Sequence, residues 1–263
     1  MATLVTFHAH PDDESIATGG VMAKAADEGH RVVLVVATKG EHGEVAEGFL
    51  EPGEQLSERR VEETEACARI LGVARVEFLG YVDSGMVGTP ENDRPESFWQ
   101  ADVEEAAARL AAILTEEKAD VLTIYDENGQ YGHPDHIQVY RVGSRAAELA
   151  GTPRVYMSTI NRDYVQRSLR EAAERGEIPG DINADDMAEI GVPEKRITTA
   201  VDVRPWLTRK RAAMAAHASQ ISESSFFLAM APEMFEGAFG IEWFVRCDAP
   251  PGLAETDLFN GLS

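Results

Sequence analysis

Two segments that lie far apart in the chain each contain the sequence His-Pro-Asp beside a further residue that can bind a metal. The first, residues 8–14, reads His-Ala-His-Pro-Asp-Asp-Glu, and the second, residues 131–136, reads Tyr-Gly-His-Pro-Asp-His. An apolar run typical of a buried strand precedes each segment, at residues 4–7 and 121–125. Polar turns that follow two buried strands predict an α/β fold in which both turns contribute to one site.

Strand-like and helix-like segments alternate from the first residues onward. Apolar and β-branched runs predict buried strands at residues 4–7, 31–37, 75–79, 120–125 and 154–158. This alternation predicts a Rossmann-like, doubly wound and mostly parallel sheet with helices on both faces. In such a sheet, with the strand order 3-2-1-4-5, the first and fourth strands are neighbours. The two His-Pro-Asp turns would then meet at the place where ligands bind in folds of this kind.

The 263 residues are enough for one large domain with an appended region. We predict a Rossmann-like domain over residues 1–160 that carries the metal site, and a smaller C-terminal α+β extension over residues 161–263 that packs on it. Residues 176–195 have no clear period and are interpreted as an insertion. Residues 226–230, Phe-Phe-Leu-Ala-Met, are predicted either to join the core or to cover the site as a lid.

The chain is strongly acidic, with 46 Asp and Glu residues against 24 Lys and Arg residues and a net charge of −22. Such a surface repels nucleic acid and anionic membranes, so neither is an expected partner. We expect no membrane span, since no apolar run is long enough, and no signal peptide. Two widely spaced cysteines, Cys67 and Cys247, form no disulfide framework and favour a cytoplasmic location. The composition allows a homo-oligomer without specifying one.

Three residues of the two turns can form a metal site. His10 and Asp13 are three residues apart in the first turn and can point to one centre, which His136 of the second turn can complete. Imidazole and carboxylate ligands together suit zinc, and three protein ligands leave a position open for water; iron(II) accepts the same ligands. In the competing interpretation Asp12 or Asp13 only caps a helix and each His-Pro turn is an ordinary loop. Two such turns at matched positions disfavour it.

Four neighbouring residues are predicted to take part in the chemistry. Asp12 is not needed as a ligand and can act as a general base toward water. His133, as an imidazolium, can stabilise an oxyanion and protonate a leaving amine, and Tyr131 can donate a hydrogen bond to the same oxyanion. Asp135 is expected to hold the ring of His133 and to raise its pKa. These roles predict a bell-shaped pH profile with an acidic limb from Asp12 or the attacking water and a basic limb from His133.

Two further histidines lie near these motifs in the sequence or share their chemistry. His8 lies on the strand that precedes the first turn and is expected to be packed rather than to bind metal. His217, in the segment Ala-His-Ala-Ser-Gln at residues 216–220, is expected on a helix as a core residue that could reach the site.

The motifs at residues 9–14 and 132–136 together resemble the signature of the PIG-L (LmbE-like) family of zinc-dependent N-deacetylases. The resemblance covers residues 4–151 and returns at residues 217–220. It implies that the zinc ligands are His10, Asp13 and His136. It also implies that Asp12 is the base, and that His133 is the acid or an electrostatic stabiliser.

Further segments resemble the mycothiol branch of this family, which contains N-acetylglucosaminyl-inositol deacetylases and mycothiol conjugate amidases. These segments are residues 40–44, position 60, residues 83–86 and residues 125–131. By this resemblance Glu44, Arg60 and Asp83 would contact sugar or inositol hydroxyls. Without it, they would be a solvated loop acid, a charge on a helix surface and a turn former.

The expected activity is that of a zinc-dependent hydrolase that removes the acetyl group from an N-acetylated amino-sugar (GlcNAc-type) conjugate by metal-activated water. A mycothiol S-conjugate amidase is the second alternative, but the amidase carries a lysine soon after its first motif, where this chain has Ser15-Ile16-Ala17. A catalytically inactive sugar-binding protein is the third, and the complete set of ligands together with Asp12 and His133 argues against it. The expected partner is a small amino-sugar conjugate.

Overall fold

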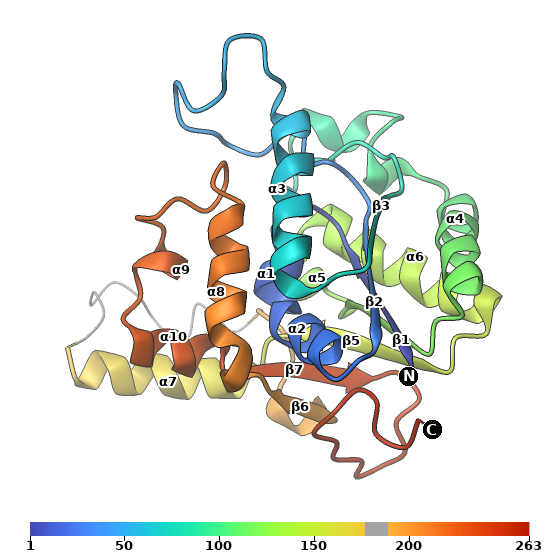
Figure 1. Cartoon of the computed structure of the whole chain (residues 1–263), viewed down its shortest axis with the longest axis vertical. Coiled ribbons are helices and arrows are strands. Elements are labelled where there is room, and N and C mark those ends of the chain that lie inside the picture. Colours follow the sequence, from blue (N-terminus) through green and yellow to red (C-terminus); the bar gives the residue numbers. More distant parts are fainter. Residues whose placement is uncertain (177–188, 263) are drawn as a thin grey trace.

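A sheet of seven strands forms the centre of the molecule in the computed structural model, which describes residues 1–176 and 189–262 (Figure 1). The strand order is β3-β2-β1-β4-β5-β7-β6. The first five strands are parallel, whereas β7 runs antiparallel to both β5 and β6. The strands are β1 (Thr3–His8), β2 (Arg31–Val36), β3 (Arg75–Phe78), β4 (Val121–Tyr125), β5 (Arg154–Thr159), β6 (Thr199–Asp202) and β7 (Ile241–Arg246).

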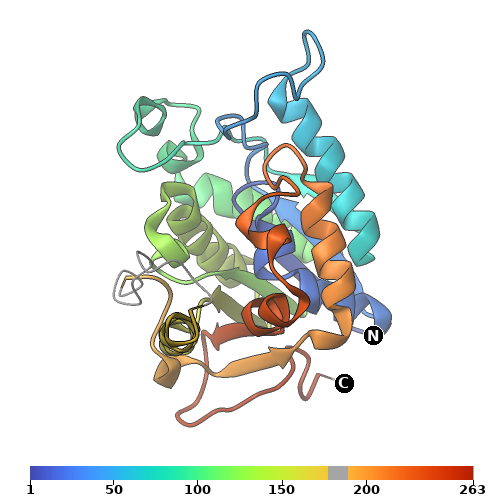
Figure 2. The same ribbon diagram turned by 90° about the vertical axis from the view of Figure 1, so that its left-hand side faces the viewer.

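Helices connect the strands and lie on both faces of the sheet (Figures 1 and 2). The α-helices are α1 (Asp13–Ala17), α2 (Gly19–Asp27), α3 (Leu56–Leu71), α4 (Val103–Glu117), α5 (Gly129–Gly132), α6 (Pro134–Ala150), α7 (Arg162–Glu174), α8 (Leu207–Ala216), α9 (Phe226–Ala229) and α10 (Pro232–Phe239). Short 3-10 helices span Pro90–Asp93, Phe98–Gln100, Glu194–Arg196 and Arg204–Trp206.

The core consists of two apolar layers, one on each face of the sheet. Along β1, Val5 and Phe7 point to the layer that α4 and α6 cover, and Leu4 points to the layer that α2, α3 and α8 cover. Alternate residues of a strand face opposite sides, and both sides are buried here. The central strands therefore read as continuous apolar runs, as expected for a parallel sheet inside an α/β fold.

The predicted fold class and the strand order 3-2-1-4-5 are confirmed. After the first turn the chain forms two short helices, α1 and α2, which Thr18 separates with a φ of −135°. The helix predicted to run through His217 ends at Ala216, and His217 follows as its C-cap residue. Part of the predicted insertion, residues 177–188, lies outside the described residues.

The C-terminal region adds strands to the same sheet. Residues after 160 contribute β6 and β7, and α8 packs against α3 and α2 of the preceding region. Of the predicted lid segment, Phe227 and Leu228 pack against a small apolar cluster that includes Met214, whereas Phe226 is exposed. The division into a domain over residues 1–160 and an extension over residues 161–263 stays a prediction.

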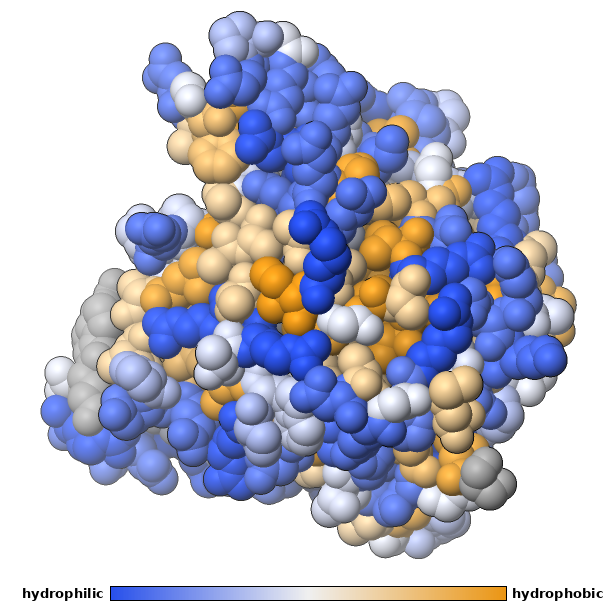
Figure 3. All heavy atoms as spheres, viewed as in Figure 1, coloured by the Kyte–Doolittle hydropathy of each residue, from blue (hydrophilic) through white to orange (hydrophobic). Residues whose placement is uncertain are grey.

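On the face of the molecule in Figure 3, hydrophilic residues cover most of the surface, with apolar residues gathered between them. Across residues 1–176 and 189–262, no helix is both long and apolar enough to cross a membrane. Both cysteines are free, Cys67 in the interior and Cys247 at the surface.

Candidate metal and catalytic site

The two His-Pro-Asp turns meet at the carboxyl edge of the sheet. Strands β1 and β4 are parallel neighbours, so the chain leaves both of them on the same side. The first turn follows β1 directly, and the second follows β4 after a short loop and opens α6 at Pro134. Pro134 suits this first helical position, because a helix leaves that N–H without an internal partner.

The predicted ligands His10, Asp13 and His136 lie together, with their donor atoms within 4.8 Å of one another. Asp13 Oδ2 is 3.4 Å from His10 Nδ1 and 3.3 Å from His136 Nε2. Ligands of a tetrahedral zinc ion are about 3.4 Å apart, given bonds of roughly 2.0–2.2 Å. These two separations match that spacing, and the structure brings the three predicted ligands together.

The charges of these residues depend on one another. Burial opposes ionisation of Asp13, but the neighbouring imidazoles, His136 first, hold the pKa of its carboxyl well below the usual value. Burial also opposes protonation of His10, yet the carboxylates of Asp83, Asp13 and Asp135 raise its pKa well above the usual value. The carboxylates around the site attract a cation, and a bound metal ion can replace the proton on His10.

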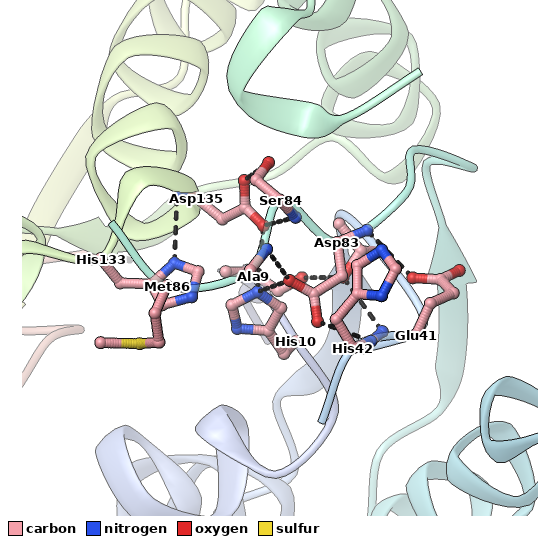
Figure 4. A network of polar contacts seen from close by, with 12 residues as sticks. Ala9, His10, Glu41, His42, Asp83, Ser84, Met86, His133 and Asp135 are labelled. Atoms are coloured by element: carbon pink, nitrogen blue, oxygen red, sulfur yellow. Dashed lines mark hydrogen bonds and ion pairs between the residues drawn. The ribbon is translucent and has the colours of Figure 1, made fainter. Parts of the chain in front are cut away.

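Asp135 holds His10 and not His133, which corrects the sequence-based expectation. Its Oδ2 is 3.1 Å from His10 Nε2 and accepts a hydrogen bond from the Ser84 amide at 2.9 Å, while Oδ1 accepts one from the Ser84 hydroxyl (Figure 4). A metal-binding histidine characteristically donates its other ring N–H to a carboxylate, which fixes the ring and its tautomer. Asp135 can therefore orient a ligand from outside the ligand set.

His133 has its own partner and a different charge from the one expected. Its Nδ1 accepts a hydrogen bond from the backbone N–H of Asp135 at 3.1 Å, so that nitrogen carries no proton. Burial, followed by the nearby His10 and His136, lowers the pKa of His133 to about 4. The expectation of a raised pKa is wrong, because burial and the imidazoles of His10 and His136 outweigh the opposite effect of the Asp135 carboxylate. The neutral ring carries its proton on Nε2, where it can act as a hydrogen-bond donor.

Asp12 lies beside the ligands in an unusual backbone conformation, with φ 93° and ψ −37°. Its Oδ2 accepts a hydrogen bond from Arg60 at 3.1 Å. Burial raises the pKa of Asp12 to about 6, although Arg60 opposes the shift. A carboxylate with a pKa in this range, outside the ligand set and adjacent in the chain to the ligand Asp13, has the properties of a general base.

The three predicted sugar-binding residues occupy three different environments. Arg60 is buried beneath the first turn and donates hydrogen bonds to the carbonyl oxygens of Pro11 and Gly40 as well as to Asp12. Asp83 is also buried, and its Oδ1 lies 3.5 Å from His10 Nε2. Glu44 is exposed on the long loop after β2. Contact of any of them with a sugar stays a prediction.

Tyrosines lie on both sides of His136. The Tyr131 hydroxyl is 3.3 Å from His136 Nε2, and almost half of the Tyr131 side chain is exposed. The ring of Tyr125 stacks on His136 from the buried side, and its hydroxyl is 2.8 Å from His8 Nδ1. His8 is therefore buried behind the site, as expected, while Tyr131 lies at its open side.

Sequence analysis missed Ser84, which holds Asp135, and the role of Glu14. The Glu14 carboxylate accepts a hydrogen bond from the Asp12 amide and is 2.6 Å from His217 Nε2. A signal was present, because Glu14 ends the first motif and His217 lies in the segment that shares the family resemblance. For Ser84, the resemblance of residues 83–86 to the mycothiol branch marked the segment but gave no role to the serine.

Comparison with known proteins relates the whole chain to deacetylases. A family model described as PIG-L, GlcNAc-PI de-N-acetylase, matches residues 5–147. A relative from Thermomonospora curvata, named 1D-myo-inositol 2-acetamido-2-deoxy-alpha-D-glucopyranoside deacetylase, is 41% identical over 283 residues, which cover 97% of this chain and 95% of the relative. A relative of the same name from Streptomyces avermitilis is 42% identical over 285 residues, which cover 99% of this chain and 97% of the relative.

A solved structure supports the same assignment at the level of the fold. N,N'-diacetylchitobiose deacetylase from Pyrococcus horikoshii is similar over 99% of this chain and 86% of that chain, with a TM-score of 0.58 and 23% sequence identity. The family predicted from the two His-Pro-Asp motifs is thus found independently by a family model and by relatives that span the chain. This protein belongs to the PIG-L family.

Proposed function

We propose that this protein is a zinc-dependent hydrolase that removes the acetyl group from an N-acetylglucosaminyl-inositol conjugate. One observation carries the proposal: the donor atoms of His10, Asp13 and His136 lie within 4.8 Å of one another, and Asp12, an ionisable carboxylate adjacent in the chain to Asp13, stays outside this set. Relatives at about 40% identity that bear the name of such a deacetylase support the choice of substrate. An active enzyme is favoured over an inactive sugar-binding protein because every predicted ligand and Asp12 are present.

The chain's own residues can divide the reaction between them. Bound zinc would polarise the acetyl carbonyl and make water a better nucleophile. Asp12 takes a proton from that water as its oxygen attacks the carbonyl carbon, and Arg60 holds the Asp12 carboxylate in place. His133, through Nε2–H, and Tyr131 donate hydrogen bonds to the oxyanion that forms. The C–N bond then breaks, Asp12 returns the proton to the departing nitrogen, and acetate and the free amine leave.

Substrate recognition is the less constrained part of the proposal. Glu44 and Asp83 lie on loops that follow β2 and β3, at the same edge of the sheet as the ligands, so they can reach sugar or inositol hydroxyls. Arg60 is buried, with hydrogen bonds to the first turn, which favours an effect on Asp12 over direct contact with sugar. Zinc is our preferred metal and iron(II) the alternative, since the ligand set suits both. The free cysteines support a cytoplasmic location.

A mycothiol S-conjugate amidase is the second candidate function. The amidase carries a lysine soon after its first motif, where this chain reads Ser15-Ile16-Ala17. None of these three residues can supply the positive charge of that lysine, and Ser15 instead donates a hydrogen bond to the Asp12 carbonyl oxygen at 2.7 Å. The replacement of the lysine favours the deacetylase.

The proposal is tested by the release of free amine from an N-acetylglucosaminyl-inositol substrate and from a mycothiol S-conjugate. The zinc-loaded protein is expected to prefer the acetylated sugar. Asp12→Ala should keep its zinc and lose at least about a hundredfold in kcat, the scale of a missing general base. A preference for the S-conjugate would favour the amidase, and equal turnover by Asp12→Ala would remove Asp12 from the chemistry.

A further inference from the structure

A buried histidine from the C-terminal region lies directly behind the first turn. His217, at the end of α8, has Nε2 2.6 Å from Glu14 Oε1, and both side chains are fully buried. The other Glu14 oxygen accepts a hydrogen bond from the backbone N–H of Asp12 at 3.0 Å. One carboxylate thus connects a residue more than two hundred positions away in sequence to the backbone of the predicted base.

The Asp12 backbone needs such support. Its φ of 93° lies in the region that residues with a side chain rarely adopt, and such a conformation persists only when several neighbours enforce it. Three neighbours do so: Ser15 donates to the Asp12 carbonyl oxygen, Arg60 donates to its carboxylate, and Glu14 accepts from its amide. The peptide that enters Asp12 is held at both of its polar groups, since Glu14 accepts from the Asp12 amide and Arg60 donates to the Pro11 carbonyl oxygen.

The His217 ring makes no other hydrogen bond in the part of the chain that the structure describes. Its Nδ1 is buried and has no partner among residues 1–176 and 189–262, so the ring's polar contact is with Glu14. Neither His217 nor Glu14 belongs to the ligand set of His10, Asp13 and His136. An influence on the reaction would therefore pass through Asp12.

We propose that Glu14 and His217 form a brace that holds the Asp12 peptide in the orientation from which its carboxylate can reach the attacking water. Both are positioning residues, since neither touches the reacting atoms. The inference rests on the proposed function, in which Asp12 is the base. It assigns the C-terminal region a direct part in setting the geometry of the reaction.

One alternative is a second metal site, because the thiol of Cys67 lies near the pair and the three donor atoms are within 4.8 Å of one another. The brace explains the arrangement without an ion, since each Glu14 oxygen already has a partner. The metal content distinguishes the two. The brace predicts that the wild-type protein and the His217 variants bind the same number of zinc ions per chain.

The test compares His217→Ala, His217→Gln and a matched control, Ser219→Ala, in the full-length zinc-loaded protein. Ser219 lies two residues further on and donates from its hydroxyl to the buried Glu63 carboxylate at 2.6 Å. Like His217, Ser219 belongs to the C-terminal region and bonds a buried glutamate. The control therefore removes a hydrogen bond to a buried carboxylate, but Glu63, unlike Glu14, is not the partner of the Asp12 amide. For each variant we would measure kcat and KM, zinc content, the melting temperature and amide exchange of the peptide that contains Asp12.

We expect His217→Ala to lower kcat by about ten- to a hundredfold, the scale for residues that support an active group from outside, with KM and zinc content unchanged. Gln can donate to Glu14, so His217→Gln should recover much of kcat. The Asp12 amide should exchange faster in His217→Ala than in wild type. Ser219→Ala should keep both the wild-type kcat and the slow exchange, whatever its melting temperature.

A second comparison tests whether the two residues act as one unit. Glu14→Ala combined with His217→Ala should be no less active than the worse single variant. Wild-type kcat in folded His217→Ala would overturn the brace while leaving the proposed function intact, provided that Asp12→Ala is inactive. Loss of one of two zinc ions in His217→Ala would also overturn it, in favour of a metal site. Full activity of Asp12→Ala would instead reject the proposed function.

Discussion

The two His-Pro-Asp turns carry backbone strain in different ways. In the first turn the residue with positive φ is Asp12, which must keep its side chain because the carboxylate is the predicted base. In the second turn the positive φ falls on Gly132, and in the loop that leads into it on Gly129 and Gln130. Glycine adopts such angles with little cost but can supply no chemistry, and Gln130 has no part in the predicted chemistry. The comparison shows that the strained position of the first turn is the one that chemistry requires.

The supports of the two turns differ accordingly. Distant elements hold the first turn, namely Arg60 of α3 and, through Glu14, His217 at the end of α8. The second turn combines contacts within its own loop, where Asp126 accepts hydrogen bonds from the amides of Asn128 and Gln130, with a distant contact, where Ser84 donates to Asp135. The first turn thus depends on α3 and α8, while the second depends in part on local sequence.

The largest expected effect treats the two turns as equals, because each contributes ligands. Substitution of His10, Asp13 or His136 by Ala should remove most of the bound zinc and lower kcat/KM by at least about a thousandfold, since the metal contributes several kcal/mol to the transition state. Inductively coupled plasma mass spectrometry measures the zinc content, and an assay of amine release measures kcat/KM. Normal zinc in the variants of either turn would remove that turn from the site.

The next largest effect concerns His133, the predicted catalytic residue of the second turn, which is neutral where Asp12 of the first turn is ionised. His133→Ala should keep its zinc and lower kcat by about ten- to a hundredfold through the loss of an oxyanion donor. Since the pKa of His133 is lowered to about 4, the ring is neutral across the working range and the basic limb of kcat/KM should not move. A basic limb that disappears in the variant would mean that His133 titrates there after all.

A smaller effect concerns the support of the first turn. Asp12 works when ionised, so kcat/KM should rise with pH through its pKa of about 6. Arg60 opposes the rise of this pKa, and Arg60→Met should therefore shift the acidic limb to higher pH, with less loss of activity at pH 9 than at pH 6. Arg60→Lys keeps the charge and should shift it less. An unmoved limb together with a raised KM would instead identify Arg60 as a sugar-binding residue.

The smallest effect tests the glycines of the second turn. Gly129 has a φ of 62°, and an added Cβ would lie 2.7 Å from His136 Cβ, so Gly129→Ala should destabilise by about 1–3 kcal/mol and lower the melting temperature by roughly 3–10 °C. Gly132, with a φ of 91° and open space around it, is the matched control. Gly132→Ala should lower the melting temperature less than Gly129→Ala does, and it should leave the zinc affinity unchanged. An equal loss in both would show that crowding at His136 has no part.

The strand pattern and the spacing of the motifs were sufficient to predict the sheet order and the meeting of the two turns, because both follow from short-range sequence and from the rules of parallel sheets. The partner of Asp135 was not predictable, since Ser84 comes from an irregular loop after β3 and His10 from another strand end. The sequence placed Asp135 two residues from His133, yet only the backbone N–H of Asp135 faces that ring. The link from Asp12 to His217 depends on the docking of α8 and has no local signature.

The central claim is that two adjacent carboxylates have different tasks, with Asp13 as a ligand and Asp12 as a base. A crystal structure of the zinc-loaded protein, with anomalous diffraction measured at the zinc edge, tests it most directly. We predict one zinc peak about 2.0–2.2 Å from His10 Nδ1, an Asp13 oxygen and His136 Nε2, with Asp12 outside bonding distance. A zinc bound by Asp12 would contradict the account, as would one held by His10, Asp83 and His133, whose donor atoms also lie within 4.8 Å of one another.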